Sequence, residues 1–167
     1  MVVFDSSTLI LVSKVEILDL FLATINLPVA IPAAVEKECC GGKKTLDGLV
    51  IQKALDESRI RCVPTKNRRL VLKLEQDFNL GKGEAEAIAL ALNEKAKLLA
   101  IDDKNGMNAC KLLGVPFTTA IGILIGGKEK GLLERTDALQ KLALLAVLGR
   151  YKETILEDAR MKLEAQP

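Results

Sequence analysis

The residues best suited to chemistry in this sequence are carboxylates that follow short apolar runs. Asp5 ends the run at residues 2–4, and Asp102 with Asp103 ends the run at residues 98–101. We interpret these runs as buried parallel strands, because they are short, apolar and separated by helical patterns. Ligands of an open parallel sheet bind outside the carboxyl ends of its strands. We therefore expect the three carboxylates to share one edge.

Further carboxylates lie on the helices that begin from the same edge. Glu84 begins a helix predicted to run to about residue 96, and Glu36 and Glu38 lie on a short helix after the strand at residues 29–31. On an ideal helix, residues two apart differ by roughly 200° of rotation, so only one of Glu36 and Glu38 can face the edge.

The absence of histidine restricts the chemistry that this edge can perform. A chain with no histidine excludes the Ser-His-Asp and Cys-His nucleophile arrangements and every histidine-containing zinc site. Converging carboxylates instead suit hard cations with oxygen ligands, such as Mg²⁺ or Mn²⁺. Such ions lower the pKa of a bound water and stabilise a leaving oxygen. The pattern predicts metal-assisted hydrolysis of a phosphodiester.

Composition favours one folded domain inside the cell. With 167 residues, 49% of them hydrophobic and 28% charged, the chain can bury most of its surface and is unlike a disordered segment. The net charge of +2 means that nucleic acid would be bound by local basic clusters. The four cysteines lack CxxC spacing, and the longest apolar run, residues 142–148, is too short to span a bilayer. We expect a cytoplasmic protein with reduced thiols.

Alternating strands and helices predict the architecture. Strands are expected at residues 2–4, 29–31, 60–63, 98–101 and 115–118, with helices between them. This order predicts a three-layer α/β/α sandwich around a parallel sheet of four to five strands. We divide the chain into residues 1–126 and a helical extension, residues 127–167, packed on the same domain. Helix breaks are expected at Gly126-Gly127 and near Gly149.

Four segments resemble motifs of one known family, in the order in which that family carries them. They are residues 2–7 (VVFDSS), 31–38 (IPAAVEKE), 80–88 (LGKGEAEAI) and 99–104 (LAIDDK). Together they resemble the PIN-domain family of metal-dependent ribonucleases, best known from the VapC-like toxins of toxin-antitoxin pairs. The resemblance covers roughly residues 1–126.

The resemblance implies which side chains hold the metal and act in catalysis. The family's spacing from Val35 selects Glu38 over Glu36. Ser7 takes the place of a polar residue that hydrogen-bonds within the site, and Glu86 is a supporting neighbour. The metal-binding carboxylates implied are Asp5, Glu38, Glu84, Asp102 and Asp103, the catalytic ones being Asp5, Glu38, Glu84 and Asp102.

Basic residues near the motifs are candidates for contact with the RNA backbone, because cleavage requires phosphate contacts more than base reading. Lys104 follows the acidic pair directly. The other candidates form two clusters elsewhere in the chain, namely Lys43 with Lys44 and Arg68 with Arg69. The resemblance also implies a homodimer and a small antitoxin protein as partners.

Two alternatives remain open at this point. The arginine that related sequences carry after Asp-Asp-Lys is replaced here by residues 106–108, Gly-Met-Asn, which favours a non-catalytic PIN-like nucleic-acid-binding or scaffold module. In the second alternative, Asp5 is the nucleophile of a haloacid-dehalogenase-like phosphatase. That family normally carries a second aspartate two residues later, where this chain has Ser7.

Overall fold

A five-stranded parallel sheet forms the centre of the protein. The computed structural model describes residues 1–42 and 45–165, so that Lys43 and Lys44, two of the expected substrate contacts, lie outside the described residues. The sheet order is β3-β2-β1-β4-β5, and every neighbouring pair is parallel. The strands are β1 (Val2–Phe4), β2 (Val29–Pro32), β3 (Ile60–Val63), β4 (Leu98–Ala100) and β5 (Phe117–Thr118).

Helices cover both faces of this sheet, which confirms the predicted three-layer sandwich. Val2 and Phe4 of β1 pack into one core and Val3 into the other, as the alternation of side chains along a strand requires. The second core is formed with α5 (Arg68–Phe78), α6 (Lys82–Asn93) and α7 (Lys104–Leu113). The first is formed with α1 (Ser6–Lys14), α2 (Leu18–Thr24), α3 (Ala33–Cys40), α4 (Leu46–Asp56), α8 (Ala120–Glu129), α9 (Arg135–Leu148) and α10 (Glu153–Glu164).

The direction in which successive strands are added to the sheet changes between β1 and β4. The chain moves from β1 through β2 to β3 on one side and then returns to place β4 and β5 on the other. Ligands of open α/β sheets bind in the crevice at such a switch point. Because Phe4 of β1 pairs with Ala100 of β4, Asp5 and Asp102 both leave the sheet at this crevice.

The expected helix break at Gly126-Gly127 is wrong. Helix α8 continues through both glycines to Glu129. A Cβ atom on Gly127 would lie 3.3 Å from Leu133 Cδ1, so the small residue allows the following loop to pack closely against the helix. Tertiary packing therefore outweighs the low helix propensity of glycine here. The break near Gly149 is present, since Gly149 caps α9.

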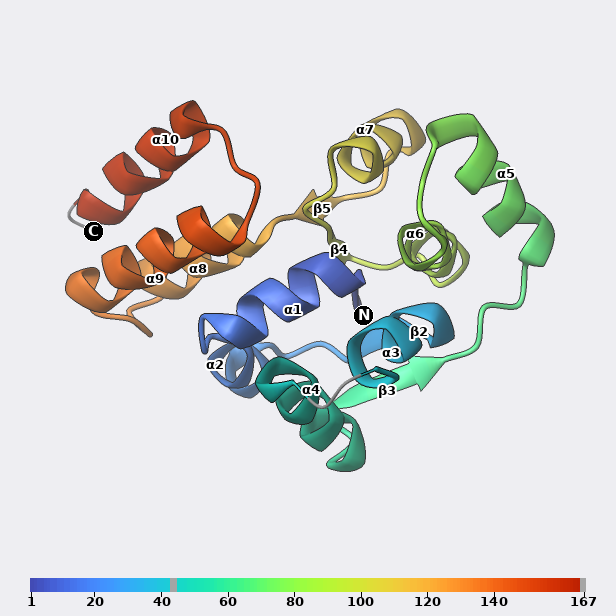
Figure 1. Cartoon of the computed structure of the whole chain (residues 1–167), viewed down its shortest axis with the longest axis horizontal. Coiled ribbons are helices and arrows are strands. Elements are labelled where there is room, and N and C mark those ends of the chain that lie inside the picture. The colour runs from blue at the N-terminus through green and yellow to red at the C-terminus, as the bar shows by residue number, and fades with distance from the viewer. Residues whose placement is uncertain (43–44, 166–167) are drawn as a thin grey trace.

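The last three helices belong to the first core. Figure 1 shows α8, α9 and α10, coloured orange to red, lying together at the end of the molecule opposite α5. Leu145 of α9 and Leu163 of α10 are fully buried in the cluster that also contains Phe4. The other side of α9 exposes Leu144 and Val147. Within residues 1–42 and 45–165, no helix has the length and apolar character needed to cross a bilayer.

Truncating Leu145 tests the contribution of the C-terminal helices to the core. Leu145→Ala should lower the free energy of unfolding by about 2 to 5 kcal/mol, because it leaves a cavity in a closed cluster. The matched control, Leu112→Ala on α7, removes the same atoms from a side chain that is 77% exposed and should cost less than about 0.5 kcal/mol. Equal, small effects of both changes in urea unfolding would contradict this packing.

Candidate active site

Asp5 is the buried centre of the carboxylate group. Its side chain is 0% exposed, although it directly follows β1. One carboxylate oxygen accepts a hydrogen bond from the backbone N–H of Thr8 over 2.8 Å, which caps α1. The other accepts from Ser7 Oγ over 2.6 Å. The acid is thus held by the first turn of the helix that it begins.

Burial changes the acidity of Asp5. The pKa of Asp5 is raised from an ordinary 3.8 to about 7, mainly because burial removes the hydration of the charged carboxylate. The nearby Asp102 carboxylate contributes to this rise, and the hydrogen bonds from Ser7 and Thr8 oppose it. In the metal-free protein, Asp5 therefore carries a proton under mildly acidic conditions, when an exposed aspartate would be charged.

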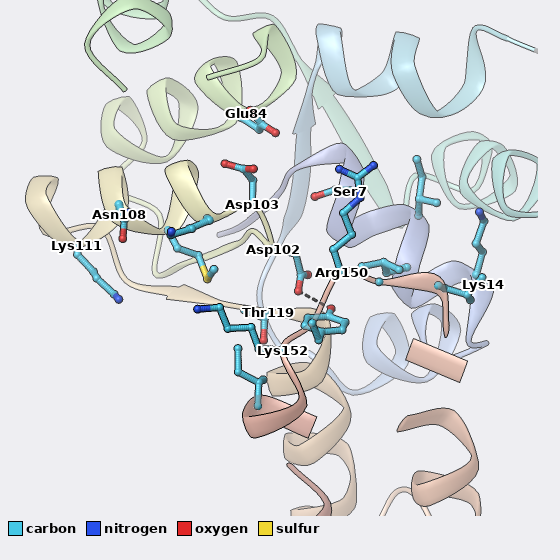
Figure 2. Close-up of a pocket in the computed structure, with 18 residues that line it drawn as sticks. Ser7, Lys14, Glu84, Asp102, Asp103, Asn108, Lys111, Thr119, Arg150 and Lys152 are labelled. Atoms are coloured by element: carbon cyan, nitrogen blue, oxygen red, sulfur yellow. Dashed lines mark hydrogen bonds between the residues drawn. The ribbon is translucent and has the colours of Figure 1, made fainter. Parts of the chain in front are cut away.

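Asp102 and Asp103 follow β4 and bond to two different helices. Asp102 Oδ2 accepts from the backbone N–H of Ala120 at the start of α8 over 2.8 Å. Its Oδ1 accepts from the Tyr151 hydroxyl over 2.6 Å, the contact dashed in Figure 2. Asp103 Oδ1 caps α7 by accepting from Gly106 N–H over 2.8 Å.

Glu84 and Glu38 complete the group from α6 and α3. Glu84 Oε2 accepts from Gly81 N–H over 2.6 Å at the start of α6, and Glu38 Oε2 accepts from Ser6 Oγ over 2.5 Å. A Cβ atom on Gly83 would lie 2.5 Å from Glu38 Oε2, so this glycine makes room for the Glu38 carboxylate beside α6. Burial raises the pKa of Glu84, and Asp103 and Glu38 raise it further.

The two remaining candidate acids point elsewhere. Glu36 lies beside the Cys62 thiol of β3, where burial first and a hydrogen bond with Glu36 second raise the thiol pKa to about 12. Glu86 is nearly buried, and its Oε2 accepts from Ala34 N–H over 3.1 Å and from Thr65 Oγ1 over 3.3 Å. Glu86 therefore joins α6 to the start of α3 and to the loop after β3.

A cavity of about 760 Å³ opens over part of this carboxylate group. Glu84, Asp102 and Asp103 line it and are labelled in Figure 2. Asp5 is buried and does not line the cavity, but Ser7, which bonds to it, does. Lys104 also lines the cavity.

The predicted pair Arg68 and Arg69 lies away from this cavity. Both side chains are exposed in the first turn of α5, and neither lines the cavity. Of the substrate contacts expected from the sequence, the structure therefore brings only Lys104 to the carboxylate group among the described residues.

Two side chains bonded to the candidate acids were missed by the sequence analysis. Ser6 bonds to Glu38, and Tyr151 bonds to Asp102 from a position 49 residues later in the chain. Ser6 stands next to Asp5, which is a usable signal. Tyr151 is the only tyrosine in the chain, but nothing local connects it with Asp102.

The donor set fits a hard divalent cation in kind, because Asp5, Glu38, Glu84, Asp102 and Asp103 offer oxygen ligands only. In the part of the chain that the structure describes, however, no three acidic or thiol side chains converge closely enough to hold an ion. Each of the five carboxylates instead bonds to a donor within the chain. The carboxylates are therefore arranged here around donors of the chain itself and not around a common ion position.

The raised pKa of Asp5 predicts a pH-dependent stability in chelator. Below about pH 4 both folded and unfolded states hold the proton, and between about pH 4 and 7 only the folded state does. The free energy of unfolding therefore falls as the pH rises through this window, by roughly 4 kcal/mol. Asp5→Asn removes the acid and should be increasingly more stable than the parent protein toward pH 8.

Urea unfolding across this pH range checks the prediction. The control is Asp77→Asn, which changes an exposed carboxylate on α5 and should alter the free energy of unfolding by less than about 0.5 kcal/mol. A stability difference between Asp5→Asn and the parent that does not vary with pH would contradict the raised pKa.

Comparison with known proteins shows the family to which the chain belongs. A family model described as a PIN domain matches residues 1–164, which includes the C-terminal helices as well as the sheet. No curated protein matches the sequence. Since the match spans nearly the whole chain, the protein belongs to the PIN-domain family, whose members are generally nucleases that use divalent metal ions.

Proposed function

We propose that the protein is a Mg²⁺- or Mn²⁺-dependent ribonuclease that hydrolyses RNA phosphodiester bonds. The observation that carries the proposal is the gathering of five carboxylates, from the ends of two strands and from α3 and α6, at the switch point of the sheet. Membership of a nuclease family supports it. The lack of histidine excludes the imidazole-based route to RNA hydrolysis.

In this proposal Asp5, Glu38, Glu84 and Asp102 hold the cation, with Asp103 beside them. A bound divalent ion supplies a water of lowered pKa and neutralises charge on the phosphate. Ser7 orients Asp5 through the 2.6 Å hydrogen bond. A cation held there would favour the charged carboxylate of Asp5 over its protonated form, because a nearby positive charge stabilises a carboxylate. Lys104, exposed at the cavity, contacts the substrate phosphate.

The surroundings of the site support two further parts of the proposal. The exposed apolar side chains Leu144 and Val147 lie on one side of α9 and suit contact with a second copy or with an antitoxin protein. The four cysteines are free thiols, as expected in the reducing cytoplasm. We therefore propose a cytoplasmic homodimer that acts as an RNA-processing enzyme or as a toxin.

One observation favours a second function, a non-catalytic PIN-like module that binds nucleic acid. Every candidate ligand is bonded within the chain, and no three acidic or thiol side chains among the described residues converge on an ion position. Such a protein would bind RNA without cleaving it. The two functions differ in whether added metal produces turnover.

Cleavage of a fluorescent single-stranded RNA tests the proposal. The parent protein should cleave with Mn²⁺ or Mg²⁺ and not with a chelator. Asp5→Asn and Glu84→Gln should each reduce the rate by about 100-fold or more, because changes even to residues that only support metal ligands cost 10- to 100-fold. Glu94→Gln, at the exposed far end of α6, is the matched control and should retain full activity.

Urea unfolding of Asp5→Asn at the assay pH distinguishes lost catalysis from unfolding, and we expect this variant to be at least as stable as the parent at neutral pH. An Asp5→Asn protein that cleaves as fast as the parent would overturn the metal assignment. A parent protein that binds RNA but never cleaves it would favour the non-catalytic module.

A further inference from the structure

The cavity over the carboxylates has a second side, built from the far end of the chain. Leu148, Gly149, Arg150, Tyr151, Lys152 and Ile155 line it, and we call these residues the C-terminal wall. They connect α9 with α10. Ser7, Asp103 and Lys104 are among the residues that line the remainder of the cavity. The wall therefore borders the same cavity as the candidate metal ligands Glu84, Asp102 and Asp103.

Two contacts fix the C-terminal wall in place. The Tyr151 hydroxyl donates to Asp102 Oδ1 over 2.6 Å, which ties the wall directly to a candidate ligand. A Cβ atom on Gly149 would lie 2.3 Å from Tyr151 Cε2, so only glycine lets the aromatic ring fold back against the end of α9.

Cationic side chains lie on both sides of Tyr151 in the sequence. Arg150 and Lys152 stand on either side of Tyr151, both are exposed and both line the cavity. Figure 2 shows the Arg150 side chain extending toward the side of the cavity where Ser7 lies. Lys14 and Lys111 line the cavity as well. Within residues 1–42 and 45–165, none of these four cations takes part in an ion pair.

Unpaired cations around an acidic centre match one class of ligand, a flexible polyanion that crosses the cleft. The carboxylates alone would repel it, whereas the flanking cations attract its phosphates. A cavity of about 760 Å³ is the size that holds a drug-sized molecule, hence one or two nucleotides of a single strand and not a duplex.

We propose that the C-terminal wall binds the phosphate backbone of single-stranded RNA, with Arg150 and Lys152 contacting phosphates and Tyr151 holding the wall at a set distance from Asp102. This inference rests on the proposed ribonuclease function and adds residues to it that lie outside the four motifs. Tyr151 is a positioning residue, since it acts through Asp102, while Arg150 and Lys152 touch the substrate.

Equilibrium binding without catalysis tests the wall separately from the nuclease activity. Fluorescence anisotropy of a short labelled single-stranded RNA is measured in chelator at several salt concentrations. Each lost phosphate contact should weaken binding about fivefold at about 0.1 M salt and reduce the log–log salt slope by about 0.7. The double change Arg150→Ala with Lys152→Ala should therefore reduce affinity about 25-fold and the slope by about 1.4.

The matched control is Arg160→Ala, which removes an exposed cation from α10 outside this cavity. It should bind RNA like the parent. Parent-like binding by the double variant, in a parent protein that cleaves RNA, overturns the wall and leaves the nuclease function standing. A parent protein that neither binds nor cleaves RNA overturns both.

Steady-state cleavage kinetics in Mn²⁺ distinguish the positioning role of Tyr151 from the substrate-binding role of Arg150. Tyr151→Phe keeps the ring and loses the hydrogen bond to Asp102, so it should lower kcat by about 10- to 100-fold and leave KM nearly unchanged. Arg150→Ala should instead raise KM with little change in kcat, because it removes a contact made equally in the bound and transition states. A Tyr151→Phe enzyme with the parent kcat would overturn the positioning role.

Discussion

Mutual repulsion among carboxylates is the constraint on which this structure depends. Five acids share one rim, and water is excluded from the innermost, Asp5. The parallel sheet reduces this repulsion, because its strands end at the same edge and the helices that follow them begin there. Backbone N–H groups at the starts of α1, α6, α7 and α8 each donate to one of these acids. Partial positive charge at helix N-termini stabilises such acids.

This arrangement explains how the protein can fold before any metal arrives. Hydrogen bonds hold four of the acids at helix starts, and Ser6 holds Glu38. Asp5 also keeps a proton until about pH 7. In the proposed function, a cation at this rim would neutralise the remaining repulsion between these acids. Repulsion between the acids and the burial of Asp5 lower the stability of the metal-free protein, as is common where a fold carries a functional site.

Much of the fold could be predicted from the sequence, because the signals were local. Short apolar runs ending in Asp5 and Asp102 gave the strands and their edge, and parallel topology placed those acids together. The helix break at Gly126-Gly127 was wrong, because packing of Leu133 against Gly127 decides that region. Whether Glu36 or Glu38 faces the rim depends on which side of α3 meets Gly83 of α6, a contact between distant segments.

The C-terminal wall could not have been found from local patterns. Tyr151 reaches Asp102 only because α8, α9 and α10 pack into the same core as β1 and bring residues 148–155 back over the rim. The division of the chain at residue 126 remains a prediction. Helix α8 runs across that position, and Tyr151, which lies beyond it, contacts an acid before it.

The most direct measurement is anomalous X-ray scattering from crystals of the protein grown with Mn²⁺. The account predicts a manganese peak within coordination distance of the carboxylates of Asp5, Glu84 and Asp102, with Glu38 turned away from Ser6 to join them. A well-ordered structure with no peak at this rim, in which all five carboxylates keep their present donors at saturating Mn²⁺, would contradict it.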